Sequence, residues 1–166
     1  MKKIIALSIA ALILVISLAG CMQDNAEIKP NGKTVYNHVT LIIDETNLNE
    51  YVDAVHYVFA GTVIEYLGNV TDPDFPDSKY IINVTENLKG NLPETIEVRK
   101  HGGYTKDGTL VLYATDFTQD SGLPEVGKQY IFMAYEQPDG SYLLAEINGN
   151  VEYSNSVRNI FLNCIG

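Results

Sequence analysis

The chain has 166 residues, with 11 basic side chains against 21 acidic ones and a net charge of −10 at pH 7. Such an acidic chain repels phosphates, so the composition excludes nucleic-acid binding as a function. The length is that of one domain with a tail, and it can bury a core without help from metals or disulfides. The 11 tyrosines favour a β-rich fold, because aromatic residues suit pleated strands.

The first 20 residues have the layout of a secretory signal peptide. Lys2 and Lys3 form a short basic region, residues 4–16 are almost entirely apolar, and small residues follow. A membrane-spanning helix is the alternative. Residues 4–20 are at the short limit for a span, however, and no basic cluster follows them. We therefore predict a cleaved signal peptide, residues 1–20.

The segment Leu18-Ala19-Gly20-Cys21 resembles the lipobox of bacterial lipoproteins. In that family diacylglycerol alkylates the cysteine thiol, and the leader is then removed just before the cysteine. The resemblance implies that Cys21 is the lipid attachment site, which anchors the protein to the extracytoplasmic face of the cell membrane. Two or more acyl chains anchor a protein stably, whereas one anchors it marginally. The alternative is a secreted protein in which Cys21 is free or disulfide-bonded.

The segment after Cys21 is polar, contains Pro30 and Gly32, and has no apolar period. It predicts a flexible tether, residues 21–33, followed by a single β-barrel domain, residues 34–166.

Strands and one helix are predicted along this domain. Residues 34–43 are rich in Thr, Val, Ile and Tyr and predict a strand. Apolar residues at 48, 51, 52 and 55 share one helical face, with Asn47 or Thr46 as the cap. This is the only helix that the pattern predicts. Gly61 indicates a bulge within a long strand. Alternating or buried apolar residues predict further strands at 57–66, 80–88, 96–99, 109–113, 130–135, 142–147 and 151–153.

Three segments, AVHYVFAGTVIEY, YIINVTENLKG and VGKQYIFMAYEQPDGSYLLAEINGNVEY, resemble the OB-fold barrels of the netrin-like and TIMP-like superfamily. The likeness lies in Gly61, in the Leu-Lys-Gly turn at 88–90, and in Gly127 with Tyr130. It implies a mainly β fold, an OB-fold-like Greek-key barrel with one short helix and added strands. Eukaryotic inhibitors of that superfamily chelate zinc through a free N-terminal cysteine and carry a disulfide framework. That chemistry is not expected here, because Cys21 would be acylated.

Cys164 lies among apolar residues near the C-terminus. If Cys21 carries lipid, Cys164 has no intrachain disulfide partner. A small buried apolar side chain is the interpretation that we favour. A reactive thiol is less favoured, because no basic residue lies close in sequence to lower the thiol pKa.

No motif assigns a catalytic residue, a metal ligand or a cofactor site. His38, His56 and His101 do not share a metal-ligand spacing. The segment KHGGY, residues 100–104, could form a phosphate-binding nest, but a flexible loop explains it better.

The loop TDPDFPDSKY carries Asp72, Asp74 and Asp77. Closely spaced carboxylates can bind calcium, yet the EF-hand spacing and its closing Glu are absent. We favour a solvated turn for this aspartate loop and leave calcium binding open.

These observations favour a non-enzymatic, lipid-anchored surface module that binds a protein or a carbohydrate. Its expected partners are the membrane lipid, through acylated Cys21, and that ligand. Tyrosines on or beside strands would suit such binding if exposed, although most are expected in the core. The alternatives are an envelope hydrolase that uses dispersed acidic residues and a protease-inhibitor-like module.

Overall fold

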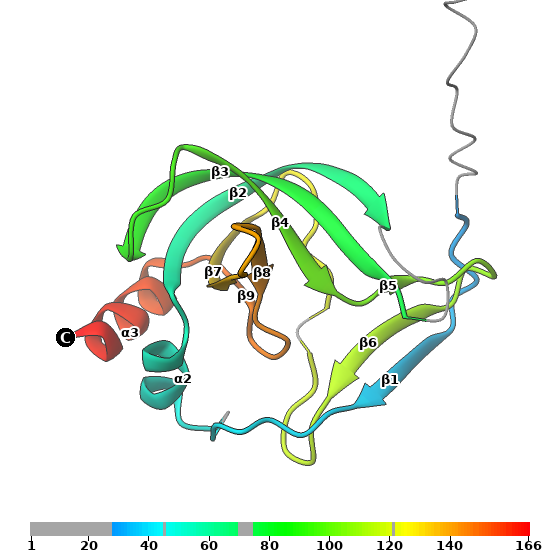
Figure 1. Ribbon diagram of the computed structural model, residues 1–166, viewed down its shortest axis with the longest axis horizontal. Coiled ribbons are helices and arrows are strands. Elements are labelled where there is room, and N and C mark those ends of the chain that lie inside the picture. Colours follow the sequence, from blue (N-terminus) through cyan, green and yellow to red (C-terminus); the bar gives the residue numbers. More distant parts are fainter. Residues whose placement is uncertain (1–27, 45, 70–74, 121) are drawn as a thin grey trace, which may run out of the picture.

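Figure 1 shows the computed structural model, which describes residues 28–166 apart from 45, 70–74 and 121. The predicted signal peptide and Cys21 lie outside the described residues, as do Asp72 and Asp74 of the aspartate loop. The described strands are β1 Thr34–His38, β2 Tyr57–Asn69, β3 Asp77–Lys89, β4 Thr95–His101, β5 Gly103–Tyr104, β6 Leu110–Ala114, β7 Gln129–Glu136, β8 Tyr142–Leu144 and β9 Asn150–Glu152. The described helices are α2 Leu48–Ala54 and α3 Asn155–Ile165.

Five strands close into a barrel, which confirms the predicted mainly β, OB-fold-like architecture. The strand order is β2-β3-β4-β8-β7, and pairing between β2 and β7 closes the barrel. Strand β9 pairs with β7 on the edge opposite β2. Most pairs are antiparallel, whereas β4 and β8 run parallel from Val98 opposite Tyr142. Strand β2 belongs to two ladders at once, with β7 over its first half and β3 along its whole length.

The predicted irregularity at Gly61 is present. The β2–β3 register shifts between Ala60 and Gly61. A Cβ at Gly61 would lie 2.6 Å from Cγ2 of Ile82, so only glycine lets the two strands approach this closely. The close pairing of β2 with β3 at this irregularity therefore requires glycine.

Apolar side chains fill two separate clusters, one on each face of the barrel wall. Along β2, Phe59 and Val63 belong to the cluster inside the barrel, whereas Val58 and Ala60 belong to the cluster outside it. The outer cluster also takes Val52 from α2 and Phe161 from α3. The helices therefore cover one outer face of the barrel.

Helix α2 begins as predicted, with Asn47 as its cap accepting from the Glu50 amide at 3.4 Å. Helix α3 was not predicted. It begins at the Ser154 cap, whose hydroxyl accepts from the Val157 amide at 3.1 Å. Cys164 lies on α3, half-buried against the outer cluster, as a free thiol.

A second, three-stranded sheet, order β1-β6-β5, lies beside the barrel (Figure 1). Strand β1 runs parallel to β6, with Thr34 opposite Leu110. The predicted strand 34–43 ends at His38, because Leu41 and Ile43 pack against the outer cluster instead. We call this sheet the small sheet.

Candidate functional site

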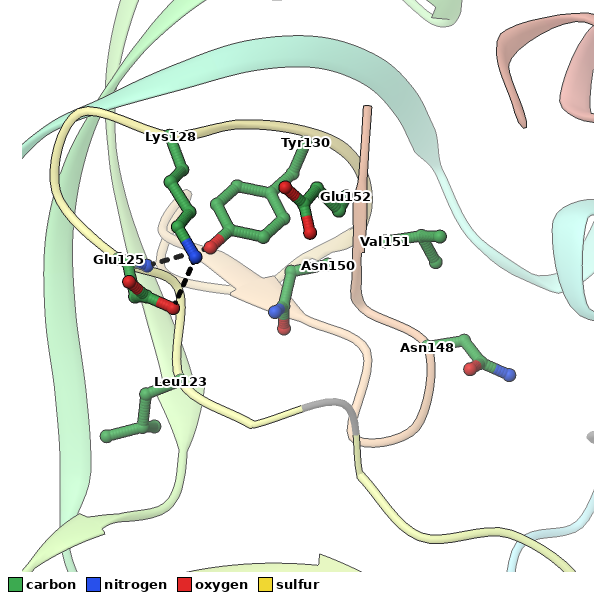
Figure 2. Close-up of a pocket in the computed structure, with 8 residues that line it drawn as sticks. All are labelled: Leu123, Glu125, Lys128, Tyr130, Asn148, Asn150, Val151 and Glu152. Atoms are coloured by element: carbon green, nitrogen blue, oxygen red, sulfur yellow. Dashed lines mark hydrogen bonds and ion pairs between the residues drawn. The ribbon is translucent and has the colours of Figure 1, made fainter. Parts of the chain in front are cut away.

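A polar pocket of about 260 Å³ opens beside the start of β7 and along β9 (Figure 2). Its lining comes from the segment before β7, from β7 itself, and from the turn that leads into β9. The residues that line it are Leu123, Glu125, Lys128, Tyr130, Asn148, Asn150, Val151 and Glu152. They are contributed by two stretches of chain about twenty residues apart, which the β7–β9 ladder brings side by side.

One wall of the pocket is built around Tyr130. This residue stands opposite Glu152 in the β7–β9 ladder, and its hydroxyl accepts from the Glu125 amide at 3.1 Å. The Lys128 ammonium lies 2.7 Å from Oε1 of Glu125 (Figure 2). That hydrogen bond raises the pKa of Lys128, so the wall presents an ammonium beside carboxylates.

The opposite wall is the turn before β9. Asn148 has a φ of 56°, a left-handed conformation that Asn tolerates better than most residues. A Cβ at Gly149 would collide with the carbonyl of Ala145, so glycine is required there. Asn150 is nearly fully buried and donates from Nδ2 to the Gly122 carbonyl at 3.2 Å. The turn is thereby tied to the segment before β7.

The pocket can both donate and accept hydrogen bonds. Lys128 donates, Glu125 and Glu152 accept, and the amide of Asn148 does both. Its volume is near the lower end of ligand pockets, which run from about 300 to 1,000 Å³. It therefore suits one small polar ligand, or one unit of a longer chain.

An apolar groove of about 280 Å³ adjoins the pocket and shares Asn148 and Val151 with it. The other lining residues are Thr46, Leu48, Val157, Ile160 and Phe161. They come from α2, α3 and the segment before α2. The pocket and the groove together form a surface that is polar at one end and apolar at the other.

A second polar site lies where β3 begins and β4 ends. The β3–β4 register sets Asp77 opposite His101, and Oδ1 of Asp77 lies 2.7 Å from Nδ1 of His101. On the other side of the ring, Nε2 lies 3.9 Å from Oε1 of Glu146. The hydrogen bond with Asp77 is the largest cause that raises the pKa of His101, and burial opposes it.

The sequence pattern assigns Asp77 to the aspartate loop and gives His101 no partner. Asp77 instead begins β3 and is buried. The prediction that residues 100–104 form a flexible loop is wrong: Lys100 and His101 end β4, and Gly103 and Tyr104 form β5.

Lys100 is fully buried, and its ammonium lies 3.0 Å from Oδ1 of Asp120. Burial lowers the pKa of Lys100, while Asp120 acts against that shift. Lys100 thus binds a carboxylate of the chain itself and does not reach solvent, so it cannot take part in a phosphate-binding nest.

The other two histidines have separate partners. Nε2 of His38 lies 2.9 Å from Oδ1 of Asp116 on the surface. Nδ1 of His56 accepts from the Glu136 amide at 2.9 Å. Among the described residues, no group of three or more His, Cys, Asp or Glu side chains could hold a metal ion.

The tyrosines singled out in the sequence divide between core and surface. Tyr80 is buried, Tyr66 is exposed, and Tyr57, Tyr104, Tyr113 and Tyr135 are half-buried. Tyr66 packs against Tyr80 with ring centroids 5.3 Å apart. These six tyrosines therefore do not form one exposed aromatic face.

Neither helix in the described part of the chain is long and apolar enough to cross a membrane. Comparison of the sequence with protein-family models and with curated proteins finds no match to either.

Proposed function

We propose that the protein is a lipid-anchored module on the extracytoplasmic face of the cell membrane that binds a carbohydrate in the polar pocket. The observation that supports ligand binding is the pocket lining, in which an ammonium, carboxylates and amides surround one small pocket. The anchor rests on the lipobox-like segment that ends at Cys21.

The chemistry of the lining matches a sugar better than an apolar ligand. Each sugar hydroxyl both donates and accepts, so it pairs well with neighbouring donors and acceptors such as Lys128 and Glu152. The apolar side chain of Leu123, which also lines the pocket, can pack against the C–H face of a sugar ring. A chain of sugars could continue from the pocket over the adjoining groove.

Titration of the purified protein with neutral and N-acetylated oligosaccharides, followed by NMR and calorimetry, tests the proposal. We expect saturable binding. The Glu152→Ala variant should weaken it about tenfold or more, because a hydrogen bond to a charged group is lost. Asn148→Gly should weaken it too, and this change preserves the left-handed backbone of the turn.

Glu94→Ala and Asn91→Gly are the matched controls. Both residues are exposed and neither lines the pocket, so both variants should bind like the parent protein. The proposal fails if no oligosaccharide binds at millimolar concentration, or if the pocket variants bind as tightly as the controls.

The anchor is tested separately with Cys21→Ser. This variant should appear in the medium or remain as an unprocessed precursor, because it lacks the thiol that is alkylated. Intact-mass measurement of the parent protein should show the mass of acyl chains on a chain that begins at Cys21. A processed, membrane-bound Cys21→Ser protein would contradict the lipid anchor.

A second candidate function is hydrolysis of an envelope polymer, which the Asp77–His101 hydrogen bond favours. A carboxylate that orients one imidazole nitrogen leaves the other available as a general base. Turnover of ester, peptide or glycoside substrates that falls about 100-fold or more in His101→Gln would support this function. Equal turnover in the parent and the variant would exclude a role of His101 as the base.

A further inference from the structure

The chain enters the described domain against the turn between β5 and β6. The Asn31 amide N–H donates to the Gly108 carbonyl at 3.0 Å, and the side chain of Asn31 donates to Asp107 O at 3.1 Å and Thr109 Oγ1 at 3.0 Å. A Cβ at Gly108 would collide with the carbonyl of Lys29. The start of the domain is therefore packed on this turn at the level of the backbone.

This entry point lies on one side of the molecule. Strands β1, β5 and β6 are on that side, whereas α2 and α3 are on the opposite side (Figure 1). Six residues separate Ile28 from Cys21, and the fully extended chain between these two residues spans at most about 25 Å. A lipid on Cys21 would therefore keep the β1–β5–β6 side near the bilayer.

The exposed side chains around the entry point are more basic than the rest of the chain. Among the described residues of this entry segment and the β5–β6 turn, Lys29, Lys33 and Lys106 are exposed beside one exposed carboxylate, Asp107. The whole chain, in contrast, has 21 acidic against 11 basic residues. Asp107 is already bound by the hydroxyls of the Thr105 and Thr109 side chains.

Apolar side chains accompany these lysines. Ile28 is 37% exposed and Tyr36 is 43% exposed. Lys with Tyr is the combination found at membrane–water interfaces, where the apolar part of each side chain enters the headgroup region. The predicted tether carries Asp24 and Glu27, whose negative charges offset part of the attraction between the lysines and anionic lipids. The apolar contacts of Ile28 and Tyr36 would add to that attraction.

We infer that this lysine end, formed by Ile28, Lys29, Lys33, Tyr36 and Lys106, rests against the anionic headgroups of the bilayer in which Cys21 is anchored. The inference rests on the lipid anchor of the proposed function. Anionic lipids attract basic residues close to the surface, and the attraction fades within a Debye length. In this orientation the groove at α2 and α3 faces away from the bilayer.

A single tryptophan can report the contact, because the chain has no Trp. The Tyr36→Trp variant of residues 21–166, in a Cys164→Ala background, is coupled through Cys21 to a maleimide lipid in vesicles that contain brominated lipid. The anchor is thus supplied chemically, so the result does not depend on whether cells acylate Cys21. We expect bromine quenching at least about twofold stronger in phosphatidylglycerol vesicles than in phosphatidylcholine vesicles, and loss of that difference in high salt.

Ile160→Trp is the matched control, because Ile160 is also exposed but lies on α3, on the opposite side of the molecule (Figure 1). Its quenching should be weak and equal in the two kinds of vesicle. Adding Lys29→Glu, Lys33→Glu and Lys106→Glu to the Tyr36→Trp protein should abolish the dependence on lipid charge. Equal quenching of the two tryptophan variants, or quenching of Tyr36→Trp that is the same with and without anionic lipid, would overturn the inference and leave the anchor itself untouched.

Discussion

The barrel and its junction with the small sheet are stabilised by different interactions. Inside the barrel, twelve buried residues form one apolar cluster that is shared among β2, β3, β4, β7, β8 and the β3–β4 turn. Where the barrel meets the small sheet, several of the buried contacts are polar, and we call this group of contacts the polar junction. They are Lys100 with Asp120, Asp77 with His101, Ser78 with the Gly102 carbonyl, and Asn150 with the Gly122 carbonyl.

This difference decides how each region responds to a change. Apolar contacts are numerous and non-directional, so neighbouring side chains can still pack together when one contact is lost. A buried polar contact is directional, and removing one partner leaves the other desolvated at full cost. The polar junction should therefore be more sensitive than the barrel to changes in pH and to the loss of a single side chain.

The largest effect is expected from breaking the buried ion pair. Asp120→Ala leaves the Lys100 ammonium buried without its carboxylate, which should lower the free energy of unfolding by about 3–5 kcal/mol. Urea denaturation measures the loss. Hydrogen exchange should show that amides of β1, β5 and β6 lose protection before those of the barrel.

The control for this ion pair replaces both partners. The double variant Lys100→Met, Asp120→Leu removes both charges and fills a similar volume, so it should recover most of the lost stability. If the double variant were less stable than Asp120→Ala, desolvation of Lys100 would not be the cause of the loss.

In the barrel the expected effect is smaller and has a steric origin. In Gly61→Ala the new methyl group would lie 2.6 Å from Ile82 and 3.1 Å from the Asn83 carbonyl. Overpacking of this kind costs about 1–3 kcal/mol. Thermal unfolding measures this loss of stability. Gly127→Ala is a contrasting variant, because its Cβ would meet nothing within 4 Å, so only the positive φ of residue 127 would cause strain. An unchanged melting temperature in Gly61→Ala would show that β2 and β3 can separate without cost.

The polar junction should also respond to pH through His101. Because the hydrogen bond with Asp77 raises the pKa of His101 above 6.5, the folded state holds its proton more tightly than the unfolded state does. This contribution to stability is complete below a pH of about 6.5 and declines as pH rises through the folded-state pKa. Urea midpoints measured on both sides of neutrality should show the decline, and His101→Gln should remove it. An NMR titration that places the His101 pKa below 6.5 would reverse the sign.

Sequence patterns predicted the barrel well because its signals are local. Alternation marks its strands, Gly61 marks the irregularity in β2, and Asn47 marks the start of α2. Helix α3 was missed although Val157, Phe161 and Cys164 recur at helical spacing, since the polar residues between them weakened the pattern.

The sites could not be predicted in the same way, because they depend on strand register. Asp77 and His101 are separated by 23 residues in the chain and meet only because β3 and β4 pair in one register. Asp77 also lies three residues before the predicted start of its strand. The pocket likewise joins Glu125 with Glu152 through the β7–β9 ladder, and no local pattern links those two residues.

The smallest effect is expected from a contact between a basic side chain and a carboxylate on the surface. His38 and Asp116 lie 2.9 Å apart, but their side chains are 56% and 78% exposed. Water solvates both groups before and after the pair is broken, so Asp116→Ala should change the stability by less than about 0.5 kcal/mol. Comparing the stability losses of Asp116→Ala and Asp120→Ala under the same denaturation conditions shows how much of the loss in Asp120→Ala is due to burial. A loss in Asp116→Ala as large as that in Asp120→Ala would mean that the small sheet depends on its ion pairs whether or not they are buried.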